Sequence, residues 1–219
     1  MKNLKNLTAT VLMLLGTTCI VNAQQTVTTD GGSGAKFGIK GGVNFSNLYT
    51  EDVDDENVLT GFNLGVFLEW PITSSLALQP EVAFTTKGAE DEYNNPTTSG
   101  RVKFRLNYIE VPVLLKFNVT RNFNLHFGPY AAFLVDSKIT NEDNNGNVNF
   151  EEAVNEDDLN KVDLGLAAGL GFDFGNIGVG ARYNYGLTTV GKEQNFLGTT
   201  YTYPDGKNSV LSLFASIKF

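Results

Sequence analysis

The sequence predicts an all-β protein: an eight-stranded antiparallel up-and-down transmembrane β-barrel with short periplasmic turns and long extracellular loops. Three observations lead to this prediction. From Lys36 onward, apolar residues alternate with small or polar residues, which is the period of a β-strand with one apolar face. The connections between these segments are short and long in alternation along the chain. The N-terminus has the composition of an export signal.

Residues 1–23 have the features of a secretory signal peptide. Lys2 and Lys5 precede an apolar run, and small residues before Gln24 suit cleavage after Ala23. The run is too short to cross a bilayer as a helix, which needs about 20 residues. Residues 24–35 are small, polar and glycine-rich, so we expect a flexible N-terminal lead-in there. The barrel is therefore expected over residues 36–219.

Eight segments carry the alternation. Their apolar residues stand at every second position of residues 37–45, 62–70, 76–84, 109–117, 123–135, 164–174, 177–187 and 211–219. Phe104, Leu106 and Tyr108 are out of phase with the fourth segment. We therefore expect a β-bulge near Tyr108 or a strand end above the bilayer. An even number of strands places both termini on the periplasmic side.

The connections fall into two groups. Three are short turns, at residues 71–75, 118–122 and 175–176. Four are long and polar, at residues 48–60, 88–102, 136–161 and 189–208. Short turns on one side and long loops on the other are typical of barrels in the outer membrane of Gram-negative bacteria. The protein is therefore expected in that membrane, with the long loops at the cell surface.

Alternation alone fits either a soluble barrel with an apolar interior or a membrane barrel with an apolar exterior. The polar face holds most of the strand glycines, which would make room for long neighbours inside a tight barrel. It also carries five acidic and five basic residues: Lys40, Glu69, Glu81, Lys87, Glu110, Lys116, Asp163, Asp173, Arg182 and Lys218. An eight-stranded interior is wide enough only for side chains. The equal numbers predict an ion-pair network that closes the lumen.

The apolar face has two further features of a lipid-facing surface. Its residues beside the short turns are largely aromatic, as at a membrane interface: Phe37, Trp70, Phe117, Phe123, Phe174 and Phe219. The chain also ends in an alternating apolar pattern that resembles the signal read by the barrel assembly machinery: Leu211, Leu213, Ala215, Ile217 and Phe219. Outer-membrane lipid and the barrel assembly machinery are therefore the expected partners.

Composition and motifs argue against several other functions. The 24 acidic residues outnumber the 16 basic ones, which does not suit a nucleic-acid partner. His126 is the single histidine, no G-x-S-x-G motif is present, and no cluster of His and Cys could hold a transition metal. We therefore predict no enzymatic activity, no catalytic residues and no resident cofactor.

One loop has the spacing of a weak calcium site. Its candidate ligands are Asn141, Asp143, Asn145, Asn147 and Glu152, with Gly146 at the sharp turn. In a calcium loop the first, third and fifth positions supply oxygens, the seventh a carbonyl and the twelfth a bidentate carboxylate. Asn141 replaces the usual first aspartate, and a strand rather than a helix leads into the loop.

Several segments resemble the PorT-like outer-membrane β-barrel family, porin-like small barrels known chiefly from Bacteroidota. They are FGIKGGVNFSNL (37–48), LNYIEVPVLLKF (106–117), FGPYAAFLV (127–135), VDLGLAAGLGFDF (162–174) and RYNYGLTTV (182–190). The resemblance covers the strands but not the long loops. It implies the barrel fold and the outer-membrane location, while one branch of the family is implicated in type IX protein secretion.

Two classes of function follow. The first is a non-enzymatic barrel with a closed, ion-paired interior that displays acidic surface loops in a structural or interaction role. The second is a transport or secretion component, either a narrow porin or a PorT-type accessory of type IX secretion. An enzyme is a third, weaker alternative. The surface or secretion partner and the oligomeric state stay open.

Overall fold

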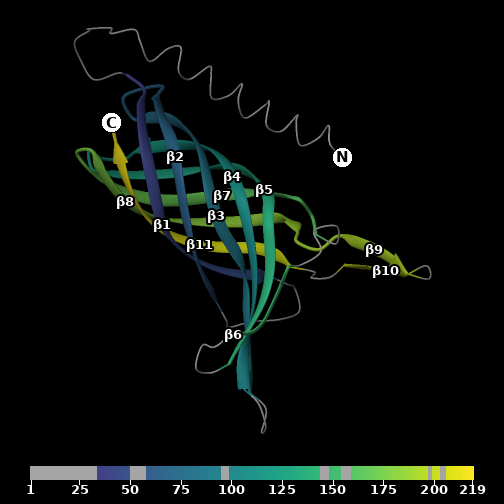
Figure 1. Ribbon diagram of the computed structural model, residues 1–219. Helices are drawn as coiled ribbons and strands as arrows, with labels where there is room; N and C mark the ends of the chain where they lie inside the picture. The colour runs from purple at the N-terminus through teal and green to yellow at the C-terminus, as the bar shows by residue number, and fades with distance from the viewer. Residues whose placement is uncertain are drawn as a thin grey trace. The chain divides into compact units, whose positions relative to one another are not determined.

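The computed structural model describes residues 34–49, 58–94, 99–143, 148–153, 159–196, 199–202 and 206–219. The predicted signal peptide and residues 24–33 of the predicted lead-in lie outside these ranges. The described residues form β-strands in two antiparallel sheets, which confirms the predicted all-β class (Figure 1). Among them there is no helix with the length and apolarity needed to span a membrane.

The main sheet contains nine strands. They are β1 (Lys36–Tyr49), β2 (Leu59–Pro71), β3 (Leu76–Asn94), β4 (Ser99–Asn118), β5 (Phe123–Asp143), β6 (Val148–Ala153), β7 (Val162–Phe174), β8 (Ile177–Thr189) and β11 (Lys207–Lys218). Their order is β4-β3-β2-β1-β11-β8-β7-β5-β6, and β4 also pairs with β5. The pairings therefore return to β4, and β6 is attached to β5 outside this ring. The sheet thus has nine strands where the sequence predicts eight. β9 (Glu193–Phe196) and β10 (Thr199–Thr202) form a separate hairpin.

The three short turns lie where the sequence predicts them. β2 and β3 are joined through residues 72–75, β4 and β5 through 119–122, and β7 and β8 through 175–176. The hydroxyls of Thr73 and Thr120 each accept hydrogen bonds from backbone N–H groups two and three residues later. Gly175 has φ of +64°, which suits a two-residue hairpin turn. These turns share one end of the ring, called here the short-turn end.

At the opposite end, the loop end, three strands continue well beyond their neighbours. β3, β4 and β5 have 19, 20 and 21 residues, against 12 to 14 in β1, β2, β7, β8 and β11. The β3–β4 pairing runs to Asn94 and Ser99, whereas the β2–β3 pairing stops at Asn63 and Thr85. We call residues 88–94, 99–107, 136–143 and 148–153 the projecting sheet (Figure 1).

The projecting sheet corrects two predicted loops. Residues 88–102 and 136–161 were expected to be long polar loops, yet the structure places most of them in β3, β4, β5 and β6. Their polar composition arises because this part of the sheet lies beyond the apolar band, which is the part of the ring whose outer face carries the alternate apolar residues. Backbone pairing and ion pairs across strands hold it together, and neither leaves a period of two in the sequence.

The out-of-phase segment before the fourth predicted strand also has an explanation. The β4–β5 register shifts between Asn107 and Tyr108, because β5 has the extra residue Val135 at this point. A bulge therefore lies beside Tyr108, as expected, but its extra residue is on β5 and the phase of β4 does not change. Leu106 and Tyr108 nevertheless point inward together with Glu110, and all three are buried. The inward-facing residues of β4 change from charged to apolar at this height. The apolar residues of the sequence therefore move from odd to even positions, although the strand keeps its phase.

Burial decides which face of the ring looks inward. Nine of the ten predicted interior charges are buried, and Asp173 is partly buried. The alternate apolar residues are exposed instead, for example Leu64 at 62 % and Leu166 at 55 %. Charged groups avoid a low-dielectric medium unless they are paired, whereas an apolar exterior suits lipid. The apolar face therefore looks outward.

Glycines on β7 make room for long side chains from β5. A Cβ on Gly165 would stand 2.5 Å from the ring of Tyr130, and one on Gly169 would stand 2.5 Å from Nε2 of His126. Gly171 accommodates Asn124 in the same way. This confirms that interior glycines make room for long neighbours, because a side chain at each of these glycines would overlap the facing side chain of β5.

Candidate functional site: the charged interior and the projecting sheet

The ten predicted interior charges come together in three clusters at successive heights. The cluster nearest the short-turn end joins two lysines and two acids. Nζ of Lys116 lies 2.9 Å from Glu69 and 2.8 Å from Asp173. Nζ of Lys218 lies 3.0 and 3.1 Å from the same two carboxylates. This four-membered arrangement, the short-turn cluster, has no net charge.

The middle cluster is centred on Glu81. Both terminal nitrogens of Arg182 donate to its carboxylate at 2.8 Å, and Lys40 donates at 2.6 Å. Gln79 adds a fourth hydrogen bond at 2.7 Å. Lys40 and Arg182 also lie 4.8 and 5.5 Å from the centre of the Phe214 ring, whose face attracts cations. A two-pronged arginine contact and a full set of partners are what a buried carboxylate requires.

The upper cluster lies toward the loop end and is centred on Lys87. This lysine has no exposed surface, and its Nζ lies 2.7 Å from Glu110 and 3.0 Å from Asp163. The ring of Tyr130 stands 4.3 Å from the same ammonium group. Asn184 donates to Glu110 and Asn208 donates to Asp163. The upper cluster has one negative charge in excess, and the middle cluster has one positive charge in excess.

An apolar layer covers the upper cluster. Leu159 and Val190, from the connections before β7 and after β8, are each 2 % exposed and pack with Leu106 and Tyr108. The backbone N–H of Asn160 donates to the carbonyl of Val190, and the Asn160 side chain donates to Gly191. This layer was not predicted from the sequence. Two isolated apolar residues in polar connections, together with the inward-facing 104–108 segment, were the available signal.

His126 lies inside the ring between the short-turn and middle clusters. It is 4 % exposed, and its ring stands 6.0 Å from that of Phe214. His126 and Ser216 both line a small cavity. In the described part of the chain, no hydrogen bond joins the Ser216 hydroxyl to His126. The volume of this cavity is about 20 Å³.

The predicted calcium ligands fall on a β-hairpin. Asn141 lies in β5 opposite Phe150, and Glu152 lies in β6 opposite Ile139. Asn141 accepts a hydrogen bond from the hydroxyl of Tyr93, and Asp143 ends β5. Asn145, Gly146 and Asn147 lie outside the described residues. Within the described ranges, no three His, Cys, Asp or Glu side chains are grouped as metal ligands.

The projecting sheet carries charge pairs on its outer face. Lys103 donates to Glu142 at 2.5 Å, and Arg101 lies 3.4 Å from Glu90. The hydrogen bond from the Lys103 ammonium holds the pKa of Glu142 below its ordinary value. Phe150 of β6 pairs with Asn141 on the opposite face and is 50 % exposed, and Val148, at the start of β6, is 56 % exposed. This sheet combines charged and apolar surface outside the apolar band.

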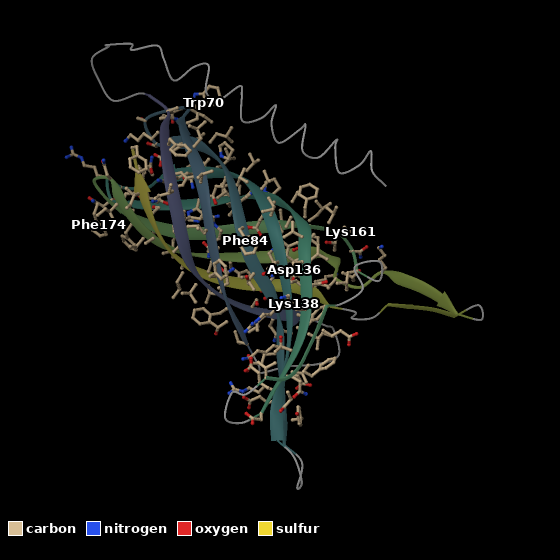
Figure 2. All side chains as sticks on the ribbon, in the orientation of Figure 1. Trp70, Phe84, Asp136, Lys138, Lys161 and Phe174 are labelled. Atoms are coloured by element: carbon tan, nitrogen blue, oxygen red, sulfur yellow. The ribbon has the colours of Figure 1, made fainter. Side chains whose placement is uncertain are left out.

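The aromatic girdle predicted from the sequence lies at the short-turn end. Trp70 and Phe174 are found there, whereas Asp136, Lys138 and Lys161 lie at the loop end (Figure 2). The predicted C-terminal assembly residues lie in or directly after β11, and all of them are exposed: Leu211, Leu213, Ala215, Ile217 and Phe219. The N–H of Phe219 donates to the carbonyl of Phe37, which ties the chain end to β1.

An antiparallel up-and-down ring with an apolar exterior and paired charges inside defines an outer-membrane β-barrel protein. The model of the family described as "Outer membrane protein beta-barrel domain" matches residues 22–191. The chain belongs to this family. No curated protein sequence matches the chain.

Solved structures of outer-membrane proteins are similar to this chain at low sequence identity. The attachment invasion locus protein Ail of Yersinia pestis, solved with the heparin analogue sucrose octasulfate, is 16 % identical with a TM-score of 0.50. The alignment covers 84 % of this chain and 99 % of Ail. Neisserial surface protein A is 18 % identical with a TM-score of 0.47, over 85 % of this chain and 99 % of that one. OprG of Pseudomonas aeruginosa is 12 % identical with a TM-score of 0.42, over 86 % and 98 %.

Proposed function

We propose that the protein is a non-enzymatic, non-conducting outer-membrane barrel that anchors the projecting sheet and acidic loops at the cell surface for interaction. The ring formed by β1–β5, β7, β8 and β11 is the closed transmembrane barrel. Residues 1–23 direct export, and the C-terminal strand engages the barrel assembly machinery. The resemblance to the PorT-like family supports this location and adds no specific secretion role.

The observation that carries the proposal is the filling of the interior. All ten charges are paired at three heights, and Leu159 and Val190 cover the loop end. A pore lining with charges of a single sign would favour ions of the opposite sign, whereas paired charges fill space and neutralise one another. Because the interior is filled, any partner must bind to the projecting sheet or the surface loops.

Planar-bilayer recording tests the closed lumen. Folded protein should insert and give no stepwise conductance, because no continuous water path crosses the three clusters and the apolar layer. Folding is verified first by different gel migration before and after boiling. Stable single-channel steps from the folded protein would contradict the proposal and favour the alternative, a narrow porin.

Photo-crosslinking in intact outer membranes tests the interaction role. A photoreactive residue in place of Phe150, which is 50 % exposed on β6, should capture one or more discrete proteins. The same residue in place of Phe62, which is 53 % exposed on the outward face of β2, should capture lipid instead. No protein adduct at position 150 would remove the interaction role. Capture of secretion components there would favour the PorT-type accessory.

A further inference from the structure

A small polar cavity lies inside the barrel between the short-turn and middle clusters. Its volume is about 20 Å³, and its polar walls include Lys40, Lys116, Lys218, Asn124, His126 and Ser216. A cavity can admit water once it has room for a sphere of roughly 10–15 Å³ and offers the water two to four polar partners. The cavity therefore has the size and the lining to hold water.

His126, which lines this cavity, has a buried ring nitrogen that lacks a partner. Its Nε2 is buried and makes no hydrogen bond within the described residues. Buried polar atoms of folded proteins are almost always hydrogen-bonded, to protein or to ordered water. The missing partner and the space to hold it thus occur at the same residue.

The neighbouring amide decides the role of that nitrogen. Nδ2 of Asn124 donates to Asp173 at 3.0 Å, so Oδ1 of Asn124 is the atom that lies 3.4 Å from Nδ1 of His126. A carbonyl oxygen accepts, and Nδ1 must therefore carry the ring proton. Nε2 is then left as an acceptor, and its partner must supply a proton.

The lysines around the cavity supply hydrogen-bond donors. Lys116 and Lys218 each contact two carboxylates, and Lys40 contacts one. Because an ammonium group has three N–H donors, each lysine keeps at least one beyond these carboxylate contacts. A ligand here has to accept from a lysine and donate to His126. Water does both, whereas a small anion such as chloride has no proton to give.

We propose that this cavity binds an ordered water molecule, which donates to Nε2 of His126 and accepts from a lysine ammonium group. The water completes the hydrogen bonding of the sole histidine and links the short-turn cluster with the middle cluster. The inference depends on the interior alone and is independent of the surface role.

A crystal structure of the full-length protein, grown with bromide in place of chloride and measured at the bromine absorption edge, tests this proposal. We expect one water peak within about 3.2 Å of Nε2 and of a lysine Nζ, without anomalous signal. An anomalous peak would make the cavity a small-anion site, and an empty cavity would make it dry. Either result overturns the proposal.

His126→Phe provides the matched variant, because it keeps a ring beside Phe214 and removes both nitrogens. The water peak should disappear in this variant. A peak that persists at the same position would contradict the role given to Nε2. If His126→Phe does not fold, the bromide data on the unmodified protein still decide between water, anion and an empty cavity.

Discussion

Glu81 accepts hydrogen bonds from Lys40, Gln79 and Arg182 inside the ring. Glu81→Gln leaves two buried cations without their shared anion, and breaking a buried ion pair typically costs about 3–5 kcal/mol. We expect a loss of this size in the free energy of unfolding, measured by urea titration in lipid vesicles. Glu92→Gln is the control, because the Glu92 side chain is 60 % exposed in the projecting sheet. Equal stability of the two variants would contradict the buried network.

Gly165 faces the interior, where a methyl group would overlap the backbone oxygen of Tyr185 at 2.3 Å and the Tyr130 ring at 2.5 Å. Forcing an extra carbon into a packed interior costs about 1–3 kcal/mol, so Gly165→Ala should lower the free energy of unfolding by that amount. Gly41→Ala is the matched control, because a Cβ there would meet Leu64 at an ordinary 3.4 Å on the outward face. A larger loss of unfolding free energy for Gly41→Ala than for Gly165→Ala would contradict the assignment of Gly165 to the interior face.

At the scale of the element, β7 presents one face to the interior and the other to lipid. Leu166 is 55 % exposed at the middle of this strand. Leu166→Arg should cost about 2–4 kcal/mol, as expected for a cation at the bilayer midplane. Thr60→Arg, at the loop end of β2, should cost about 0–1 kcal/mol, as expected near the interface. Vesicle unfolding titrations compare the two, and equal costs would argue against a membrane-spanning β7.

The β5–β6 hairpin contains the predicted calcium loop, which stays a prediction. Calcium at this spacing should bind weakly, on the order of 10⁻⁴–10⁻³ M, as in extracellular modules. Millimolar calcium, but not magnesium, should slow limited proteolysis between β5 and β6, and Glu152→Gln should abolish the effect. Equal cleavage under all conditions would show that this is an ordinary acidic connection.

The sequence predicted strands well where one face meets lipid and the other meets the interior. Phe123, Leu125 and Phe127 alternate with Asn124 and His126 because these two environments differ sharply. The projecting sheet has no such difference, so the sequence predicts loops at β6 and at the loop-end halves of β3, β4 and β5. Their strand structure depends on pairing with neighbours, which composition does not record.

The interior charges were identifiable from alternation, but their partners were not. Glu81 and Arg182 are 101 residues apart in sequence, and their contact depends on the register of several strands around the ring. The apolar layer was missed for a similar reason. Leu159 and Val190 reach the interior only because the connections that carry them bend over the loop end and bond to each other.

At the scale of the whole molecule, the account requires the apolar face to lie in lipid. Trp70, the single tryptophan of the chain, is 59 % exposed on that face at the short-turn end. Fluorescence quenching by brominated lipids in reconstituted vesicles tests this requirement directly. We predict strong quenching by lipids brominated near the headgroup, weaker quenching by lipids brominated deep in the chain, and little by aqueous iodide. Full accessibility to iodide with no quenching by any brominated lipid would contradict the outward-facing apolar surface.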